Sequence, residues 1–368
     1  MSEKIPKGWK WVKLGEVAEI KMGQSPESKY YNDKGIGLPF LQGNKTFGYR
    51  YPEIDMFCSN PIKIARKGEI LISVRAPVGD INITNQDICI GRGLASINSL
   101  FNQNEFLFYC LKYSKNDLLA SETGTVFGSI NKDTLNNFPI LLPPLPEQKS
   151  IAEVLSSIDD KIDLLHRQNK TLEEMAMTLF RQWFIEPTKD GLPEGWEEVS
   201  LGEFFPVITG KKDANFATDD GSYPFFTCSQ KPLKAPSYSF DGNAILLAGN
   251  GDFNIKRYKG KFEAYQRTYV LIPYNSEYFN FLYLLMKFNL DEITRSFKGS
   301  VINYITKDMI TNFKFSLPKD RPSIKDKLLY FDRIYDKVDA NTSQIQTLDK
   351  LRDTLLPKLI DGEVRVAV

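Results

Sequence analysis

The residues that could carry catalysis in this sequence do not complete a catalytic motif. Residues 124–130 hold two glycines but lack the lysine with which a phosphate-binding loop reaches the β- and γ-phosphates. Residues 142–145 contain paired prolines but no polar residue to bind the target amine of an amino-methyltransferase. Glu19 and Lys21 resemble the end of a nuclease metal motif, but no suitable aspartate precedes them. These gaps predict a chain that catalyses no reaction by itself.

Histidine and cysteine are too sparse for a metal centre or a nucleophile triad. His166 is the sole histidine and follows Leu165 in a helical pattern, so we expect it on a helix surface. The four cysteines are scattered without any Cys-x-x-Cys spacing, which predicts free thiols in a reducing cytoplasm. No apolar run reaches the roughly 18 residues of a membrane helix, and the N-terminus has no signal core. We therefore expect a cytoplasmic protein with no membrane partner.

Charge alone does not select a class of ligand. The chain has 47 basic and 46 acidic residues, a formal net charge of +1. A domain that binds nucleic acid by itself usually has a clear basic excess. Any binding to DNA must therefore come from local groups of residues, or from partner subunits that add positive charge.

Arginine, lysine, asparagine and glutamine are the side chains that most often bind base edges and phosphates. In the first half of the chain, candidates lie in a turn-like stretch at 42–45 and at two later arginines; in the second half, residues 255–262 form the densest basic and aromatic run. The predicted DNA-binding residues are Gln42, Asn44, Lys45, Arg75, Arg92, Lys256, Arg257, Lys259, Arg267 and Lys298. The alternative for such a charged run is a solvated surface without a ligand.

An internal repeat organises these candidates. Residues 6–16 return as residues 193–203, an offset of 187, with seven of eleven positions identical. Later matches follow in the same order, most of them at an offset of 175; they include Pro39 with Pro224, Ile70 with Ile245, and Ile130 with Ile305. In this alignment Arg267 is the counterpart of Arg92, which is equally consistent with a framework role for both. The repeat predicts two similar modules and an internal pseudo-two-fold arrangement.

Each module mixes short strands with short helices. Apolar runs at 69–74 and 244–248 are bounded by turn residues, as is typical of strands. Residues 106–113 and 279–288 have the pattern of short helices. The sequence therefore predicts an α+β fold with two α/β modules in tandem, each followed by a long helix.

A long helix follows each module. After Pro146 and before Pro187, apolar residues recur at strict seven-residue intervals, which is typical of a coiled coil. The second helix begins after Pro322 and ends near Pro357 and Gly362. The residues predicted to form the interface are Ile151, Ile158, Leu165, Leu172 and Leu179 in the first helix and Ile334, Val338, Ile345, Leu348 and Leu355 in the second.

The two helices are predicted to pair with each other. About 40 residues make a helix of roughly 60 Å, too long to bury its apolar stripe against its own module. The order of the segments then requires an antiparallel coiled coil. Gln168 and Gln344 occupy equivalent positions in the stripes. They either form a polar layer that fixes the register or point to solvent at the edge of the stripe.

The chain is therefore predicted to have four segments. They are a first module at 1–145, a helix at 146–189, a second module at 190–320, and a helix with the C-terminal tail at 321–368. Two unlike modules on a stiff spacer suit an asymmetric two-part DNA site, since B-DNA presents the same face about every 34–36 Å. The base pairs between the two parts would be left unread.

Three motifs resemble the specificity subunits of type I restriction–modification systems. They are the Pro-x-Gly-Trp-x-x-Val-x-Leu-Gly-Glu opening of each half, the Leu-Pro-Pro-Leu-Pro-Glu-Gln run at 142–148, and the C-terminal run at 355–366. The resemblance covers the whole chain in the same order. Residues 317–322 depart from the family pattern, so the second junction between module and helix differs from the first.

The resemblance implies two target recognition domains that enter the major groove of double-stranded DNA. It implies two DNA methyltransferase (M) subunits docked on the helices, together with restriction/translocase (R) subunits. S-adenosylmethionine, ATP and Mg²⁺ would bind those partner subunits, and this chain would hold no cofactor and no metal.

Two other classes of protein compete with this interpretation. A coiled-coil scaffold with protein-binding end modules explains the helices and the neutral charge, but not the repeated motifs. A nuclease or methyltransferase that acts alone is disfavoured by the incomplete catalytic motifs.

Overall fold

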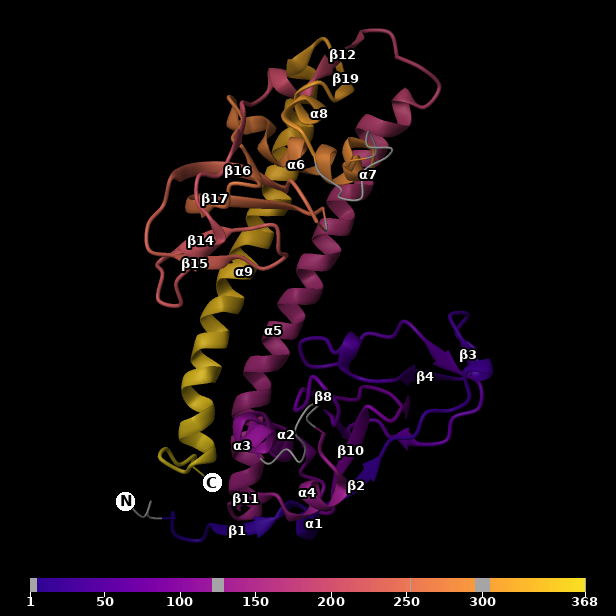
Figure 1. The fold of residues 1–368 in the computed structure, drawn as a ribbon, viewed down its shortest axis with the longest axis vertical. Coiled ribbons are helices and arrows are strands. Elements are labelled where there is room, and N and C mark those ends of the chain that lie inside the picture. Colours follow the sequence, from indigo (N-terminus) through magenta and orange to yellow (C-terminus); the bar gives the residue numbers. More distant parts are fainter. Residues whose placement is uncertain (1–4, 121–128, 252, 295–304, 368) are drawn as a thin grey trace. The chain divides into compact units, whose positions relative to one another are not determined.

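The computed structural model describes residues 5–120, 129–251, 253–294 and 305–367. The chain divides into two units: unit 1 is Met1–His166 with Thr342–Val368, and unit 2 is Arg167–Asn341. Each unit contains one module and one segment of both long helices (Figure 1). The division thus cuts through both helices, whereas the four predicted segments follow the order of elements along the chain.

Unit 1 is built from short strands and short helices. β1 (Lys10–Lys13) pairs with β11 (Pro139–Leu142). A four-stranded sheet has the order β2 (Ala18–Met22), β10 (Leu94–Ser99), β7 (Ile70–Ser73), β8 (Ile81–Ile83). A second sheet has the order β3 (Tyr31–Asn32), β5 (Phe57–Cys58), β4 (Leu38–Leu41), β9 (Ile88–Ile90), β6 (Ile64–Ala65). The module's helices are α1 (Leu14–Val17), α2 (Asn104–Tyr113), α3 (Lys115–Ala120) and α4 (Lys132–Asn137).

The core of unit 1 lies around α2. Six consecutive residues of this helix, Phe106–Leu111, are buried, because one face of α2 packs on the four-stranded sheet and another packs toward α5 (Figure 1). Ile70 and Ile72 of β7 and Ile151 of α5 join the same apolar cluster. Burial on both sides explains why α2 is apolar nearly all round rather than along one stripe.

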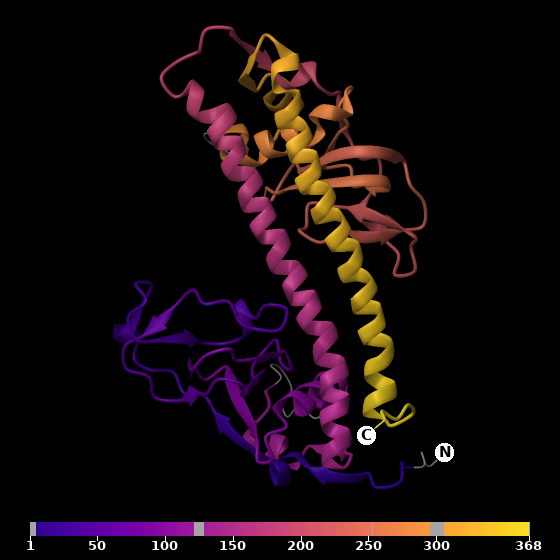
Figure 2. The same ribbon diagram turned by 180° about the vertical axis from the view of Figure 1, so that it is seen from behind.

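Unit 2 repeats this plan with longer strands. β12 (Trp196–Ser200) pairs with β19 (Lys314–Pro318). One sheet has the order β13 (Val207–Thr209), β18 (Thr268–Leu271), β16 (Phe240–Ala248), β17 (Ile255–Ala264), β14 (Tyr223–Phe226), β15 (Leu233–Ala235). The module's helices are α6 (Phe279–Phe288), α7 (Leu290–Thr294) and α8 (Lys307–Thr311). Helix α6 takes the place of α2, packed on β16 and β17. Figure 2 shows the module from behind, with its strands coloured rose to orange.

The repeat seen in the sequence is a repeat of strand pairing. Val12 of β1 lies opposite Ile140 of β11, and Val199 of β12 lies opposite Phe315 of β19. The offsets between these two pairs are 187 and 175, as the sequence alignment predicts. The predicted fold class, two α/β modules in tandem with a long helix after each, is confirmed.

The long helices are α5 (Leu145–Phe180) and α9 (Lys325–Ile360), and they pack antiparallel within each unit. In unit 1, Glu147 pairs with Arg365 just beyond α9, and Asp159 pairs with Arg352. In unit 2 the helices are also antiparallel: Asn169 of α5 contacts Asn341 of α9, and Phe180, later in α5, contacts Phe331, earlier in α9. Across the described ranges, none of the helices has the length and apolarity needed to cross a membrane.

Most of the predicted interface residues lie on the facing sides of α5 and α9. Those buried at 8% exposure or less are Ile151, Ile158, Leu165, Ile334, Val338 and Ile345. Those half-buried against the same clusters are Leu172, Leu179, Leu348 and Leu355. The exposed Gln168 and Gln344 lie at the edge of the stripe. Buried Asn341 forms a polar layer here, because its Nδ2 donates to Asn169 Oδ1 over 2.9 Å and to Gln168 Oε1 over 3.5 Å.

Candidate nucleic-acid interface

In unit 1, the structure brings Gln42 and Arg92 together at the surface. Both are exposed, and both contact Ser25: its hydroxyl bonds the Gln42 amide at 2.9 Å and accepts the backbone N–H of Arg92 at 3.2 Å. Ser25 and the neighbouring exposed Gln24 were missed by the sequence analysis. The result is a group of amide, hydroxyl and guanidinium donors that is suited to base edges and phosphates.

Two glycines allow the turn that carries Arg92 to approach Gln42. A Cβ atom at Gly91 would lie 2.6 Å from the Gln42 side-chain oxygen, and one at Gly93 would lie 2.6 Å from the Gln42 carbonyl oxygen. The backbone N–H of Gly93 donates to that same carbonyl. Larger residues would push the turn away, so Arg92 is held at the tip of a closely packed backbone turn.

The other predicted residues of unit 1 are placed differently. The amide of Asn44 donates to Asp80 Oδ2 over 2.6 Å and to the carbonyl of Pro77, so it joins two loops of the module. Lys45 and Arg75 are exposed, and Arg75 is bridged to Ser129 through the backbone. Lys45 and Arg75 therefore remain available to a ligand, whereas the Asn44 amide already has partners within the protein.

In unit 2, Arg267 lies at a surface depression of about 320 Å³ that Thr209, Asn250 and Gln266 also line. The turn is again packed against glycine: a Cβ atom at Gly249 would lie 2.6 Å from the Arg267 carbonyl oxygen. Arg267 and Gln266 are exposed and Asn250 is half-buried. Unit 2 therefore presents amide and guanidinium groups at the same strand ends as unit 1.

The strand registers correct the sequence alignment at Arg92. Leu94 of β10 and Thr268 of β18 pair with equivalent positions of their neighbouring strands, at an offset of 174 rather than 175. The counterpart of Arg92 is therefore Gln266, not Arg267 as the sequence alignment predicts. One residue is lost between the aligned strands, which a comparison of residue types alone did not reveal. An alignment of the two modules by their paired strands identifies Gln266 as the counterpart of Arg92.

The basic run of β17 is largely directed into the protein. Arg257 is only 10% exposed and makes a bidentate ion pair with Asp339, and Lys259 pairs with Asp336. Lys256 is half-buried, donates to Asn254, and has its pKa lowered by burial. These contacts give the three cations partners inside unit 2, so we do not include them in the candidate interface. Lys298 lies outside the described residues.

Unit 1 also has a surface depression, which adds basic residues that were not among the predicted DNA-binding residues. Lys21, Lys63, Arg66 and Lys132 line it. Lys21 bonds the carbonyl oxygen of Ile64 and lies 3.7 Å from Glu69, and Arg66 pairs with Asp87, which lowers the pKa of that carboxyl through a hydrogen bond. Lys63 and Lys132 are exposed cations beside the strand ends.

The described residues contain no group of three or more His, Cys, Asp or Glu side chains that could hold a metal ion. Cys58, Cys89 and Cys110 are buried free thiols, and Cys228 is a half-buried one. His166 is exposed on α5, with its ring 5.3 Å from that of Tyr49. The amide, hydroxyl and guanidinium groups at the candidate interface offer hydrogen bonds and charge pairing to a ligand.

Comparison with known sequences relates the whole chain to one family. The family profile described as type I restriction modification DNA specificity domain matches residues 6–174 and 193–349. The type I restriction enzyme MjaIX specificity subunit of Methanocaldococcus jannaschii is 28% identical over 415 residues, covering 99% of this chain and 95% of its own. The putative MjaX specificity subunit of the same organism is 45% identical over 174 residues, which span 46% of this chain and 41% of that relative.

A solved structure shares the fold. The S subunit of a type I restriction-modification system from M. genitalium superposes with a TM-score of 0.68 at 18% sequence identity. The match covers 98% of each chain. At this level of identity, the likeness supports the architecture of modules and helices described above.

Proposed function

Because the chain belongs to the family of type I restriction–modification DNA specificity domains, we propose that it recognises the DNA target of such an enzyme. The target is an asymmetric two-part sequence with an unread gap of fixed length. In this proposal the chain supplies recognition and no catalysis. Methyl transfer with S-adenosylmethionine, and translocation and cleavage with ATP and Mg²⁺, belong to partner subunits.

The observation that carries this proposal is the paired occurrence of one surface feature. Each module presents a glycine-packed turn with exposed polar side chains at equivalent strand ends: Gln42 and Arg92 in unit 1, Gln266 and Arg267 in unit 2. The framework recurs while the exposed residues differ. Two modules of this kind are suited to two different half-sites, since direct readout depends on the identity of the side chains at the base edges.

The long helices supply the surface proposed to bind two methyltransferase subunits. Exposed apolar side chains lie along them, including Val154 and Leu351 in unit 1 and Met175, Leu329 and Tyr330 in unit 2. In this proposal these side chains are covered by the partner subunits, since an apolar surface patch often marks a protein-binding site. Partner subunits would also supply positive charge. With a net charge of +1, the chain depends on their basic residues to bind the DNA phosphates.

The test of the proposed function is the methylation pattern of a cell that expresses this chain with its methyltransferase subunit. Single-molecule sequencing of the genome should reveal methylated bases in one two-part motif with a gap of one length. A host that carries the methyltransferase alone is the control and should lack the motif. Methylation without a two-part motif, or a complex that binds proteins but no DNA, would contradict the proposal.

Lengthening both helices should lengthen the gap. One heptad inserted into α5 and one into α9 adds about 10 Å to each, which corresponds to roughly three base pairs at 3.4 Å per base pair. We expect methylated sites with both original half-sites and a gap longer by about three base pairs, measured by genome-wide methylation sequencing. An insertion into α5 alone is the control, because unequal helices lose their register. An unchanged gap would show that the helices do not determine the spacing.

Removal of Arg92 should weaken binding to the target. A base-specific or phosphate contact from an arginine is worth about 1–3 kcal/mol, so we expect Arg92→Ala to weaken binding about tenfold or more. The measurement is a mobility-shift titration of the assembled complex on its methylated motif at fixed salt. Lys189→Ala removes a charge from an exposed residue that pairs with Glu186 outside both modules, and should leave binding unchanged. Equal binding by both variants would exclude Arg92 from the interface.

A further inference from the structure

In unit 2, an arginine and a lysine of the module are held by two aspartates of the long helix. Both terminal nitrogens of Arg257 bond the Asp339 carboxylate of α9, at 2.6 and 2.9 Å. The guanidinium carbon lies 4.4 Å from the ring centre of Tyr335, also on α9. Lys259 of the same strand reaches Asp336 over 2.8 Å. A half-buried carboxylate, a planar fork and an aromatic face together favour one geometry.

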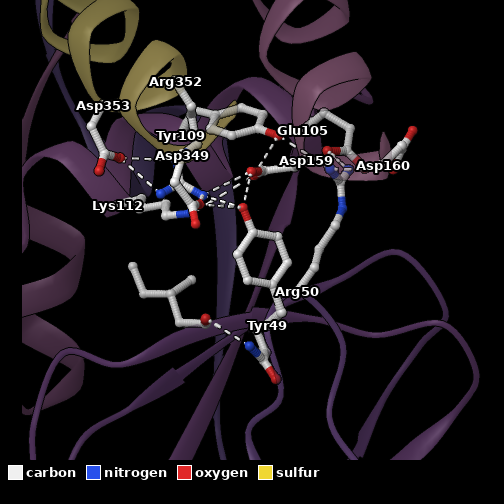
Figure 3. Close-up of polar contacts among 12 residues, drawn as sticks. Tyr49, Arg50, Glu105, Tyr109, Lys112, Asp159, Asp160, Asp349, Arg352 and Asp353 are labelled. Atoms are coloured by element: carbon white, nitrogen blue, oxygen red, sulfur yellow. Dashed lines mark hydrogen bonds and ion pairs between the residues drawn. The ribbon is translucent and has the colours of Figure 1, made fainter. Parts of the chain in front are cut away.

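In unit 1, Arg50 makes a corresponding contact with α5. Its side chain is 2% exposed and extends from the module toward Asp160, with the two groups 3.4 Å apart (Figure 3). Glu105 of α2 pairs with the same guanidinium at 2.6 Å, and the hydroxyl of Tyr109 accepts a bond over 3.1 Å. The ring of Phe108 lies 5.9 Å from the guanidinium carbon. Arg50 is thus a buried cation that joins a loop, α2 and α5.

The two acidic segments that receive these arginines are equivalent in the repeat, although the arginines pair with different aspartates within them. Residues 160–163 read Asp-Lys-Ile-Asp and residues 336–339 read Asp-Lys-Val-Asp, at an offset of 176. In both segments the first aspartate pairs with a module cation: Asp160 with Arg50, and Asp336 with Lys259. We call these two segments the helix sockets. Each lies on the helix that follows its own module.

The arginines themselves are not equivalent. Ile83 of β8 pairs with Ile70, and Arg257 of β17 pairs with Ile245, so Ile83 is the counterpart of Arg257. In unit 1 the arginine comes instead from the adjacent segment, where the carbonyl of Arg50 accepts the N–H of Ile83 over 2.9 Å. The two guanidinium groups therefore reach equivalent sockets from neighbouring backbone positions of different sequence origin.

Arg50 lies in a stretch that unit 2 has shortened. Pro39 and Ile70 are 31 residues apart, whereas their counterparts Pro224 and Ile245 are 21 residues apart. Because this stretch differs in length between the two modules, the repeat does not predict an arginine at position 50 from one at position 257, or the reverse. Each module thus places an arginine on the equivalent acidic segment of its own helix by a different route. This indicates that anchoring the module there, rather than the sequence around the arginine, is what the architecture requires.

We propose that Arg50 and Arg257 are positioning residues that fix the orientation of each recognition module on its helix socket, and so restrict the enzyme to one gap length. This inference rests on the proposed function. Arg50 lies eight residues after Gln42, in the segment between β4 and β5, and Arg257 lies ten residues before Arg267. A module that tilts on its helix would move its base-contacting turn along the DNA. The half-site it binds would stay the same, but the gap between the two half-sites would change.

The test uses Arg50→Lys and Arg257→Lys in the full chain, assembled with its methyltransferase subunits. Lysine keeps the positive charge but lacks the planar fork, so it loosens the contact without leaving the aspartates unpaired. We expect methylation to spread to sites whose gap is one base pair longer or shorter, at least tenfold above the wild-type level at those sites, with both half-sites unchanged. Lys314→Arg, at an exposed ion pair with Glu198 that lies outside the candidate interface, is the matched control and should keep the single gap.

A charge reversal distinguishes positioning from simple stability. Arg257→Asp should abolish most methylation, and the double variant Arg257→Asp with Asp339→Arg should restore it at the original gap. If the lysine variants keep the wild-type gap distribution, or if methylation only falls evenly at wild-type sites, the inference is wrong. If the wild-type complex itself methylates no two-part motif, the proposed function fails instead, so the two failures are separable.

Discussion

Replacing Phe180 with alanine is expected to lower the free energy of unfolding of unit 2 by about 4 kcal/mol, the usual range for a fully buried aromatic residue. Phe180 is 0% exposed. Its ring lies 5.8 Å from those of Phe184 and Phe281 and 5.9 Å from that of Phe288, and it also contacts Phe331 of α9. Because the rings come from both long helices and from α6, the cavity would loosen the module and the helix pair together.

Urea unfolding followed by hydrogen exchange checks this prediction, because peptides from unit 2 and unit 1 report separately. Met175→Ala is the matched control on the same helix: Met175 is 37% exposed, so its truncation should cost less than about 1 kcal/mol. Phe180→Leu, which retains most of the apolar volume, should be intermediate. Equal losses for Phe180→Ala and Met175→Ala would show that the aromatic cluster does not hold unit 2 together.

Replacing Asp159 with asparagine is expected to cost unit 1 about 3 kcal/mol at neutral pH. The Asp159 side chain is 1% exposed and accepts hydrogen bonds from Tyr49 at 2.7 Å and Tyr109 at 3.0 Å. It also pairs with Arg352 at 3.0 Å and with Lys112 at 3.6 Å (Figure 3). Removing one member of a buried ion pair leaves uncompensated charge, which usually costs about 3–5 kcal/mol. We expect the lower end, since other carboxylates still contact Arg352.

The cost of Asp159→Asn should depend on pH in one direction. Burial alone would raise the pKa of Asp159, but the charge of Lys112 and the bonds from Tyr49 and Arg352 lower the pKa below its usual 3.8. A carboxyl group whose pKa is lower in the folded state than in the unfolded state stabilises the fold at any pH above its unfolded-state pKa. This stabilisation is lost as the pH falls through the folded-state pKa. The difference between the wild type and the variant should therefore be full at pH 7 and should shrink only below about pH 4. Burial and Asp159 raise the pKa of Tyr49, so its hydroxyl remains a donor at neutral pH.

Urea denaturation at pH 7 and at pH 3 measures this difference. Asp353→Asn is the control, because Asp353 pairs with the same Arg352 but is 64% exposed, so its loss should cost less than about 1 kcal/mol. A difference between wild type and Asp159→Asn that stays constant down to pH 3 would contradict the assigned charge of Asp159.

The helix seam shows how far residue periodicity predicts packing. In unit 1 the buried residues Ile151, Ile158 and Leu165 follow the predicted seven-residue interval. In unit 2 the buried residues are Ala176, Phe180 and Phe184, four apart, so the seam moves away from the predicted leucines. A straight α-helix has 3.6 residues per turn and drifts from a seven-residue repeat. Phe184 also lies in a π-helical turn, Arg181–Ile185, that follows α5. Aromatic residues of α6 that fill the groove favour this drift, and the helical sequence alone does not contain them.

The candidate interface shows where residue type stops being informative. Arg92 and Arg267 are exposed at glycine-packed turns, as expected of residues that meet a ligand. Arg257 has the same chemistry in a more basic stretch, yet its partner Asp339 lies 82 residues away in the chain. An ion pair of that separation depends on the packing of a strand against a helix, so no local pattern distinguishes a guanidinium that binds DNA from one that binds its own protein.

The sequence by itself determined the duplication, the order of modules and helices, the antiparallel pairing of those helices, and the family resemblance. Those features depend on repeated local patterns: turn residues, strand alternation and apolar spacing. Tertiary structure alone decided which cations are free and which are paired, that Gln266 is the counterpart of Arg92, and that Arg50 and Arg257 reach equivalent helix sockets. The physical reason is that charge pairing acts between side chains that are neighbours in space, and only the packed fold brings residues 50 and 160, or 257 and 339, within 4 Å.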